Sequence, residues 1–156
     1  MELKEIMAAF AAEIGLTDLA PDEDGAYHLG IDDMTVSFAE DGGRLLTWAV
    51  LGDPPPEGKD LLNNVLLEAM FMGRATGGAV FSIEHESGRV FLHRHDSLAG
   101  MELDGFKATL EGFVNALEAW THTIADFRAV APEVEQAEQT NAEEARMMGL
   151  GGFMQV

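Results

Sequence analysis

The segment from Asp60 to Met72, DLLNNVLLEAMFM, has the length of a helix but is apolar around almost its whole circumference. At 3.6 residues per turn, Leu61 and Val65 lie on one side of such a helix, and Leu67 and Phe71 lie on the opposite side. Only two asparagines and one glutamate interrupt this apolar ring. A helix that covers one face of a small domain needs a single apolar stripe, so we expect this helix to be buried on two sides. A second subunit is a candidate for the second side, which makes oligomerisation the first functional expectation.

Hydrophobic periodicity predicts the other elements of the chain. Apolar residues spaced by three and four indicate helices, and alternation indicates strands. The predicted helices cover residues 3–14, 60–72 and 103–128, and the predicted strands cover residues 27–31, 34–38, 44–51, 79–84 and 89–95. The order α-β-β-β-α-β-β-α, with antiparallel strands between helices, is typical of the α+β class. We therefore expect an antiparallel twisted sheet of about five strands with three helices.

The composition changes after the last predicted helix. The pair Ala131-Pro132 is expected to end that helix, because proline removes a backbone donor from a helix interior. Residues 133–145 are acidic and rich in small side chains, and the chain closes with the methionine-containing stretch RMMGLGGFMQV. We therefore divide the chain into a domain of residues 1–129 and an acidic, partly mobile tail of residues 130–156. Two interpretations of the tail stay open: it is disordered, or it docks on a neighbouring subunit or on the protein's own binding surface.

The charge of the chain excludes several classes of partner. There are 28 acidic residues and nine basic ones, so the formal charge is −19, and no cluster of lysine or arginine offsets it. Nucleic acids and anionic membrane surfaces are recognised by cations, so neither is expected as a partner. The negative charge serves solubility alone or attracts a basic partner, and both interpretations stay open.

Three further features bear on where the protein works. The chain has no cysteine, no apolar stretch long enough to span a bilayer, and no secretory-signal pattern in its first ten residues. Together they predict a cytoplasmic protein.

Motifs for catalysis, phosphate binding and metal binding are absent from the sequence. The serines lack a GxSxG elbow, and the glycine pairs are not followed by GK[ST]. His93 and His95 share one face of a predicted strand, but Arg89 shares that face, and no compelling third and fourth ligands accompany the two imidazoles. We therefore expect neither an enzyme nor a site for a metal or cofactor. Two arrangements stay open at this point: a catalytic triad assembled from distant residues and a transition-metal site at His93 and His95.

Six short strings lie along the predicted domain in a characteristic order. They are Gly30-Ile31-Asp32-Asp33, Leu51-Gly52 before the prolines, Leu61-Leu62 through Glu68-Ala69, Gly77-Gly78-Ala79-Val80, Ser87-Gly88-Arg89-Val90, and Phe113-Val114 through Trp120. No single string is specific, but their order and spacing together are. Over residues 1–129 the chain resembles the Tir chaperone family, the class I chaperones of bacterial type III secretion.

This resemblance implies a cytoplasmic, homodimeric chaperone without enzymatic activity or cofactor. Such a chaperone binds the N-terminal region of a secreted effector and keeps it soluble and competent for export. Family dimers pair largely through the second helix, which is the apolar segment described above. The dimer interface implied by the resemblance consists of Leu62, Leu66, Leu67, Met70 and Phe71.

A chaperone of extended polypeptide needs an exposed apolar surface that partner side chains can fill. The third predicted strand is apolar on both faces, so neither face is plainly a solvent face. We assign effector binding to its less bulky face, formed by Leu45, Ala49 and Leu51, together with Phe91 of the last strand. A second interpretation is that these residues meet the second subunit. The alternative function is a regulatory or small-ligand-binding α+β domain with the same fold.

Overall fold

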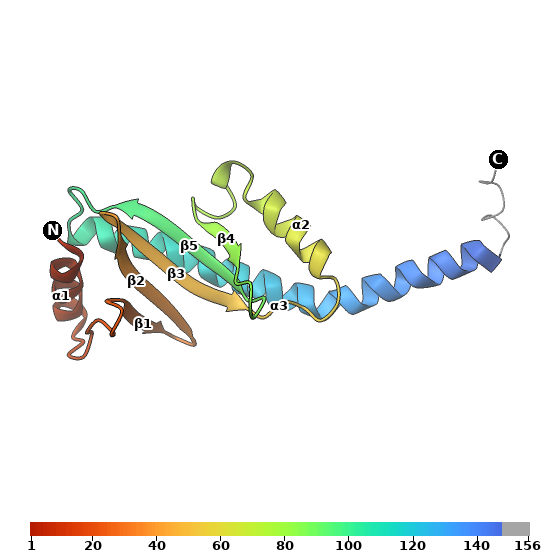
Figure 1. The fold of residues 1–156 in the computed structure, drawn as a ribbon, viewed down its shortest axis with the longest axis horizontal. Coiled ribbons are helices and arrows are strands. Elements are labelled where there is room, and N and C mark those ends of the chain that lie inside the picture. Colours follow the sequence, from red (N-terminus) through yellow and green to blue (C-terminus); the bar gives the residue numbers. More distant parts are fainter. Residues whose placement is uncertain (148–156) are drawn as a thin grey trace.

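The computed structural model describes the backbone of residues 1–147 and the side chains of residues 1–127 (Figure 1). Three α-helices and a five-stranded antiparallel sheet follow the predicted order, so the predicted α+β class is confirmed. The helices are α1 (Leu3–Ile14), α2 (Lys59–Ala69) and α3 (Leu103–Met147), and the short 3-10 helix η1 (Phe71–Gly73) follows α2. The strands are β1 (Tyr27–Ile31), β2 (Met34–Asp41), β3 (Arg44–Gly52), β4 (Val80–Ile83) and β5 (Val90–Ser97), which lie in the sheet in the order β1-β2-β3-β5-β4.

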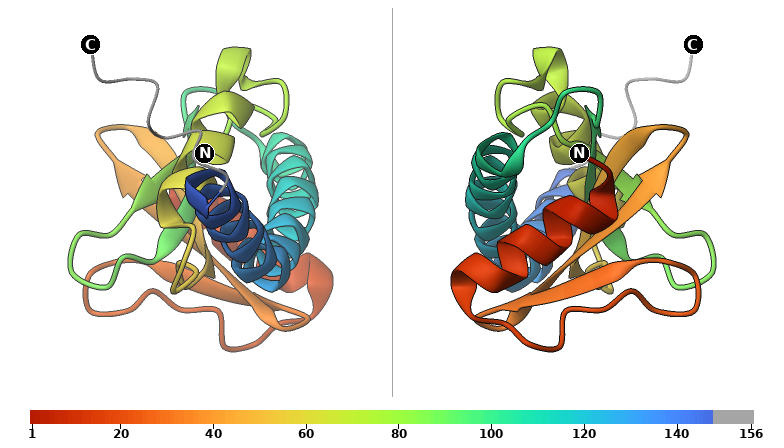
Figure 2. Two further views of the ribbon diagram at one scale, coloured as in Figure 1. Left: turned by 90° about the vertical axis from the view of Figure 1, so that its right-hand side faces the viewer. Right: turned by 90° about the vertical axis from the view of Figure 1, so that its left-hand side faces the viewer.

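The core lies between one face of the sheet and α3, and α1 packs at one end of it (Figure 2). The first part of α3 contributes a buried seam of residues spaced by three, four or seven positions, as the sequence predicts. This seam consists of Phe106, Leu110, Phe113, Leu117 and Ile124. Phe106 lies between Phe10 of α1 and Phe38 of β2, with ring centroids 5.3 and 5.4 Å away. These aromatic contacts join α1, the sheet and α3 in one core.

The segment that connects α2 to β4 packs against the middle of α3 through Trp120. The indole Nε1 donates a hydrogen bond to the carbonyl of Ala75 at 2.9 Å. The indole ring meets the ring of Phe81 edge-on, with centroids 4.8 Å apart. Leu62 and Leu66 of α2 are buried in the same core. One side of α2 is therefore fixed to the domain, and no side chain of residues 1–127 covers its other side.

Two helix ends differ from the prediction. α2 ends at Ala69 rather than at Met72, because Met72 takes a φ of 60° that an α-helix does not accommodate. α3 continues to Met147, so the expectation that Ala131-Pro132 ends this helix is wrong (Figure 1). Glutamate, glutamine and alanine predominate after Pro132, and these residues favour helix strongly enough to continue it beyond the proline. The methionine-containing end from residue 148 onward lies outside the described residues.

Candidate functional site

The face of the sheet opposite α1 and α3, called here the open face, is covered by no helix of the described part of the chain (Figure 2). Side chains alternate across each strand, so Leu46, Trp48 and Val50 of β3 point to this face. The antiparallel register places Phe91 opposite Val50. An apolar area on the open face, called here the open-face patch, consists of Leu46, Trp48, Val50, Val80 and Phe91, and all five are half-buried or exposed.

The centre of the open face is hollowed. The depression has a volume of about 380 Å³ and is lined by Leu46, Trp48, Ser82, Phe91, His93 and His95. This volume is comparable to that of a small-ligand pocket, but the depression is open to solvent rather than enclosed. Its lining offers apolar surface and few polar groups, so it suits the apolar side chains of a partner.

Charged side chains are rare on the open face. Along the five described strands, the only lysine, arginine, aspartate or glutamate residues that alternate to this face are Asp41 and Arg44, which pair with each other at 3.6 Å at one corner. The whole chain carries a formal charge of −19, yet Asp41 is the one acidic residue of the five described strands that alternates to this face. A sheet face exposed to water is ordinarily polar. The open face therefore has the composition of a surface that a partner covers.

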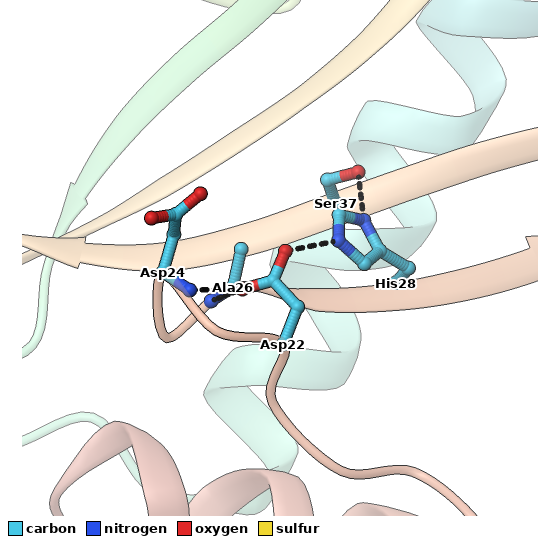
Figure 3. A network of polar contacts seen from close by, with 5 residues as sticks. All are labelled: Asp22, Asp24, Ala26, His28 and Ser37. Carbon is cyan, nitrogen blue, oxygen red and sulfur yellow. Dashed lines mark hydrogen bonds and ion pairs between the residues drawn. The ribbon is translucent and has the colours of Figure 1, made fainter.

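A chain of polar contacts joins the loop at Asp22 to His28 of β1 and Ser37 of β2 (Figure 3). His28 Nε2 lies 2.9 Å from Asp22 Oδ2, and His28 Nδ1 lies 2.8 Å from Ser37 Oγ. Hydrogen bonds from His28 and from the backbone amide of Ala26 hold the pKa of Asp22 below its ordinary value. The imidazole of His28 also meets Trp48 edge-on, with centroids 6.5 Å apart.

These contacts contain the residue types of a serine hydrolase triad but not its arrangement. In such triads the serine faces Nε2 of the histidine and the carboxylate faces Nδ1, whereas Ser37 and Asp22 take the opposite nitrogens. Ser37 is also buried beneath its neighbours, although a nucleophile needs access to its substrate. The contacts position His28 against Trp48 and tie the loop at Asp22 to β1.

Two further histidines line the depression on the other side of Trp48. His93 Nδ1 lies 3.1 Å from Ser82 Oγ, and the rings of His93 and His95 are nearly perpendicular with centroids 5.9 Å apart. Burial and the neighbouring His95 lower the pKa of His93. This environment therefore disfavours the charged form of His93.

Most of the described domain matches a known family of chaperones. Residues 5–121 match the Tir chaperone protein (CesT) family. The chain belongs to this family. The family predicted from the order of elements and strings is therefore confirmed.

Solved structures with a similar fold include complexes of type III secretion chaperones. A chain of the ExsC-ExsE complex is 24% identical with a TM-score of 0.65, and the similarity covers 79% of this chain and 93% of that chain. A chain of the HopA1-SchA chaperone-effector complex is 18% identical with a TM-score of 0.64, covering 76% and 92%. A chain of the complex of the Yersinia pestis type III secretion chaperone SycH with a fragment of YscM2 is 18% identical with a TM-score of 0.56, covering 74% and 97%. No curated protein matches this chain.

The CesT-family chain does not bring its four predicted effector-binding residues together on one surface. Leu45, Ala49 and Leu51 lie on the inner face of β3 and are buried in the core. Phe91 lies on the open face, opposite Val50. The expectation that the less bulky face of β3 is exposed is therefore wrong. Large residues of α3 fill the core, so the face with the small Ala49 fits beneath this helix and the bulkier face stays outside.

The five predicted dimer residues of the CesT-family chain also divide into two groups. Leu62 and Leu66 are buried in the core of their own chain. Met70 is half-buried, and its sulfur accepts a hydrogen bond from the amide of Phe81 at 3.3 Å. The other two are exposed, at 63% for Leu67 and 75% for Phe71. The exposed apolar residues of this region, called here the outer α2 surface, are Leu61, Leu67, Phe71 and Met72.

Sequence reasoning missed two members of the outer α2 surface, Leu61 and Met72, and four members of the open-face patch, Leu46, Trp48, Val50 and Val80. The signal for the patch was present, because β3 is apolar on both faces. Within the described residues, no group of three or more histidine, aspartate or glutamate side chains is placed to hold a metal ion. No described helix is both long and apolar enough to cross a bilayer.

Proposed function

We propose that this CesT-family chain is a cytoplasmic, homodimeric chaperone that binds the N-terminal region of a type III secretion effector and keeps it soluble and competent for export. The open-face patch is the effector-docking surface in this proposal, and the outer α2 surface joins the two subunits. The observation that carries the proposal is the apolar, nearly uncharged open face in a chain of charge −19.

The patch suits an unfolded partner rather than a small ligand. Its depression opens to solvent, so a polypeptide can lie across it and insert apolar side chains without entering the domain. Burial of apolar surface contributes about 25 cal/mol per Å², and an extended segment gains such contacts at successive positions. The fold similarity to the HopA1-SchA chaperone-effector complex supports the same interpretation.

The outer α2 surface suits a second copy of the chain. Leu67 and Phe71 are among the most exposed large apolar residues of the described part of the chain. A two-fold axis would bring the same surface of both subunits together, so each exposed residue would meet a counterpart. Leu62 and Leu66 support this surface from the core side of α2 rather than contacting the partner themselves.

Effector capture tests the docking surface. The chain, tagged and expressed in the bacterium that encodes it, is purified with its partners, which mass spectrometry identifies. We expect one secreted protein in stoichiometric amount with the wild type and its loss from Val50→Glu, because a carboxylate would be buried against apolar side chains without a partner.

The matched control for capture is Ile14→Glu. Ile14 is 48% exposed and Val50 is 44% exposed, so both substitutions place the same charge at similar exposure, but Ile14 lies on α1 away from the patch. Capture should survive in this control. Equal capture by both variants and the wild type would reject the open-face patch as the docking surface.

The mass of the purified chain in solution tests the dimer. The wild type should run as a dimer by size-exclusion chromatography with light scattering, and the double substitution Leu67→Glu with Phe71→Glu should give folded monomers. Both side chains are exposed, so the substitutions leave the core intact. A monomeric wild type, or a double variant that stays dimeric, would contradict the proposed interface.

A further inference from the structure

Three of the five histidines in the chain lie on the open face, and all three lie around Trp48. His28 contacts Trp48 from the side of β1, and His93 is paired with Trp48 across β3 and β5. His95 is the next residue of β5 on the same face. Histidine is the side chain whose ordinary pKa brings a change of charge between pH 5 and 8. Along the five described strands, these imidazoles are the most numerous titratable groups on an otherwise nearly uncharged face.

The surroundings of His93 and His95 contain little that would stabilise two positive charges. His93 faces Trp48 of β3, and from β4 it faces Val80 and the hydroxyl of Ser82. Its titratable neighbour within the described part of the chain is His95, whose ring is 5.9 Å away. Protonation of both rings would place two like charges side by side in an apolar depression, which is unfavourable.

Among the side chains of residues 1–127, charged groups reach this pair of histidines from one side only. Asp41 of β2 lies 3.3 Å from His95 Nε2, and Arg44 of β3 pairs with the same carboxylate at 3.6 Å. Asp41 already pairs with Arg44 and is more than half exposed, so it would offset a positive charge on His95 only in part. No carboxylate among the described residues pairs with His93.

His28 differs from the pair because both of its ring nitrogens already have partners. Nε2 donates to the carboxylate of Asp22, and Nδ1 meets the hydroxyl of Ser37 (Figure 3). If His28 were protonated, it would keep its contact with Asp22, and its positive charge would lie beside the negative carboxylate. Its protonation therefore changes the open face less than protonation of His93 and His95 does.

We propose that the open-face patch is a proton-gated docking surface, which binds an apolar, uncharged segment of a partner polypeptide while His93 and His95 are neutral and releases it when they are protonated. This inference rests on the proposed function and adds a means of release. The occupant is apolar because the patch is apolar, and it is uncharged because Asp41 and Arg44 lie at one corner and already pair with each other.

Burial by a partner sets the direction of the effect. A partner that covers the depression removes water from both imidazoles and favours their neutral forms further, so binding is linked to proton release. The dissociation constant then rises about tenfold per pH unit for each histidine that must lose a proton, once the pH is below that histidine's pKa. The lowered pKa of His93 places its share of this rise on the acid side of the ordinary histidine range.

Binding of Nile red, an uncharged apolar dye, tests the gate on the free protein. Its dissociation constant is measured by fluorescence at about pH 7.5 and about pH 5.5, where ordinary histidines change charge. The wild type should bind at the higher pH and bind measurably more weakly at the lower pH. The double substitution His93→Gln with His95→Gln should bind with little change between the two conditions, and His28→Gln should behave as the wild type.

Two controls test whether the dye binds at the open-face patch and whether every variant is folded. Trp48→Glu should lose dye binding at both pH values, and circular dichroism should show the same folded state for all variants at both pH values. Affinity that does not depend on pH, a double variant that keeps the full pH dependence, or dye binding that survives Trp48→Glu would each overturn the gate.

The dye measurement separates this inference from the proposed function. A pH-independent dye affinity together with effector capture that still depends on Val50 would remove the gate and leave the chaperone function standing. If Val50→Glu left effector capture unchanged, the open-face patch would be rejected as the docking surface, regardless of the result with the dye.

Discussion

The two faces of β3 differ in the opposite sense from what their side chains suggest. The inner face carries Ala49 and is buried, whereas the open face carries Trp48 and stays accessible. Side-chain size alone would bury the face with the tryptophan. Burial is instead decided by fit to α3, whose own large residues leave room for a small one. A bulky apolar face left outside such a core is therefore a feature to be explained by a partner rather than by folding.

The largest expected difference in stability comes from placing an aspartate on the inner face or on the open face of β3. Leu51→Asp puts a carboxylate in the core without a partner and should lower the free energy of unfolding by about 4 kcal/mol or more. Val50→Asp, one residue away on the open face, should change it by less than about 1 kcal/mol. Urea denaturation followed by circular dichroism measures both. Equal losses would show that the two faces are buried alike.

A smaller effect is expected from added volume. Ala49→Leu forces extra methyl groups beneath α3 and should lower the free energy of unfolding by about 1–3 kcal/mol. Val50→Leu adds volume on the open face, where Val50 is 44% exposed, and should change stability by less than about 0.5 kcal/mol. Thermal unfolding compares the two. A tolerated leucine at position 49 would contradict the close fit of the inner face.

The smallest effect concerns the pH dependence of stability. The folded state lowers the pKa of His93, so the unfolded chain binds more protons just below the ordinary histidine pKa, and stability should rise with pH through that range. Asp22 has a lowered pKa for a different reason, and its contribution is present above the ordinary aspartate pKa and is lost only in stronger acid.

The pair of variants His93→Gln and Asp22→Asn separates these two ranges. The melting temperature of each variant is measured as a function of pH. The increase in melting temperature with pH near the ordinary histidine pKa should disappear in His93→Gln and persist in Asp22→Asn. An unchanged profile for His93→Gln would show that this imidazole titrates alike in the folded and unfolded chain.

Much of the fold follows from local patterns in the sequence. The seam from Phe106 to Ile124 and the alternation along β3 define α3 and the sheet before any packing is known. The end of α3 was not predictable from Pro132, because the residues beyond it favour helix and outweigh one lost hydrogen bond. The end of α2 depends on the left-handed φ of Met72, and a methionine in the sequence does not predict such a backbone conformation.

The candidate surfaces were harder to predict because burial depends on partners distant in sequence. The apolar ring of α2 predicts two buried sides, but only the packing of the folded core shows that Leu62 and Leu66 lie on the inner side. Likewise, β3 is apolar on both faces, and the choice between them is made by α3, more than fifty residues later. The network of Asp22, His28 and Ser37 joins residues whose meeting depends on the register of β1 and β2.

Cysteine protection tests the docking surface most directly, because the chain has no native cysteine to interfere. Val50→Cys places a thiol on the open-face patch, and Ile14→Cys places one at similar exposure on α1. Each variant is labelled with a maleimide, alone and in complex with its co-purified effector. We predict that the effector slows labelling at position 50 at least about tenfold and leaves position 14 unchanged, as burial of one thiol and not the other requires. Equal labelling of Val50→Cys with and without the effector would contradict the assignment of the open face as the docking surface.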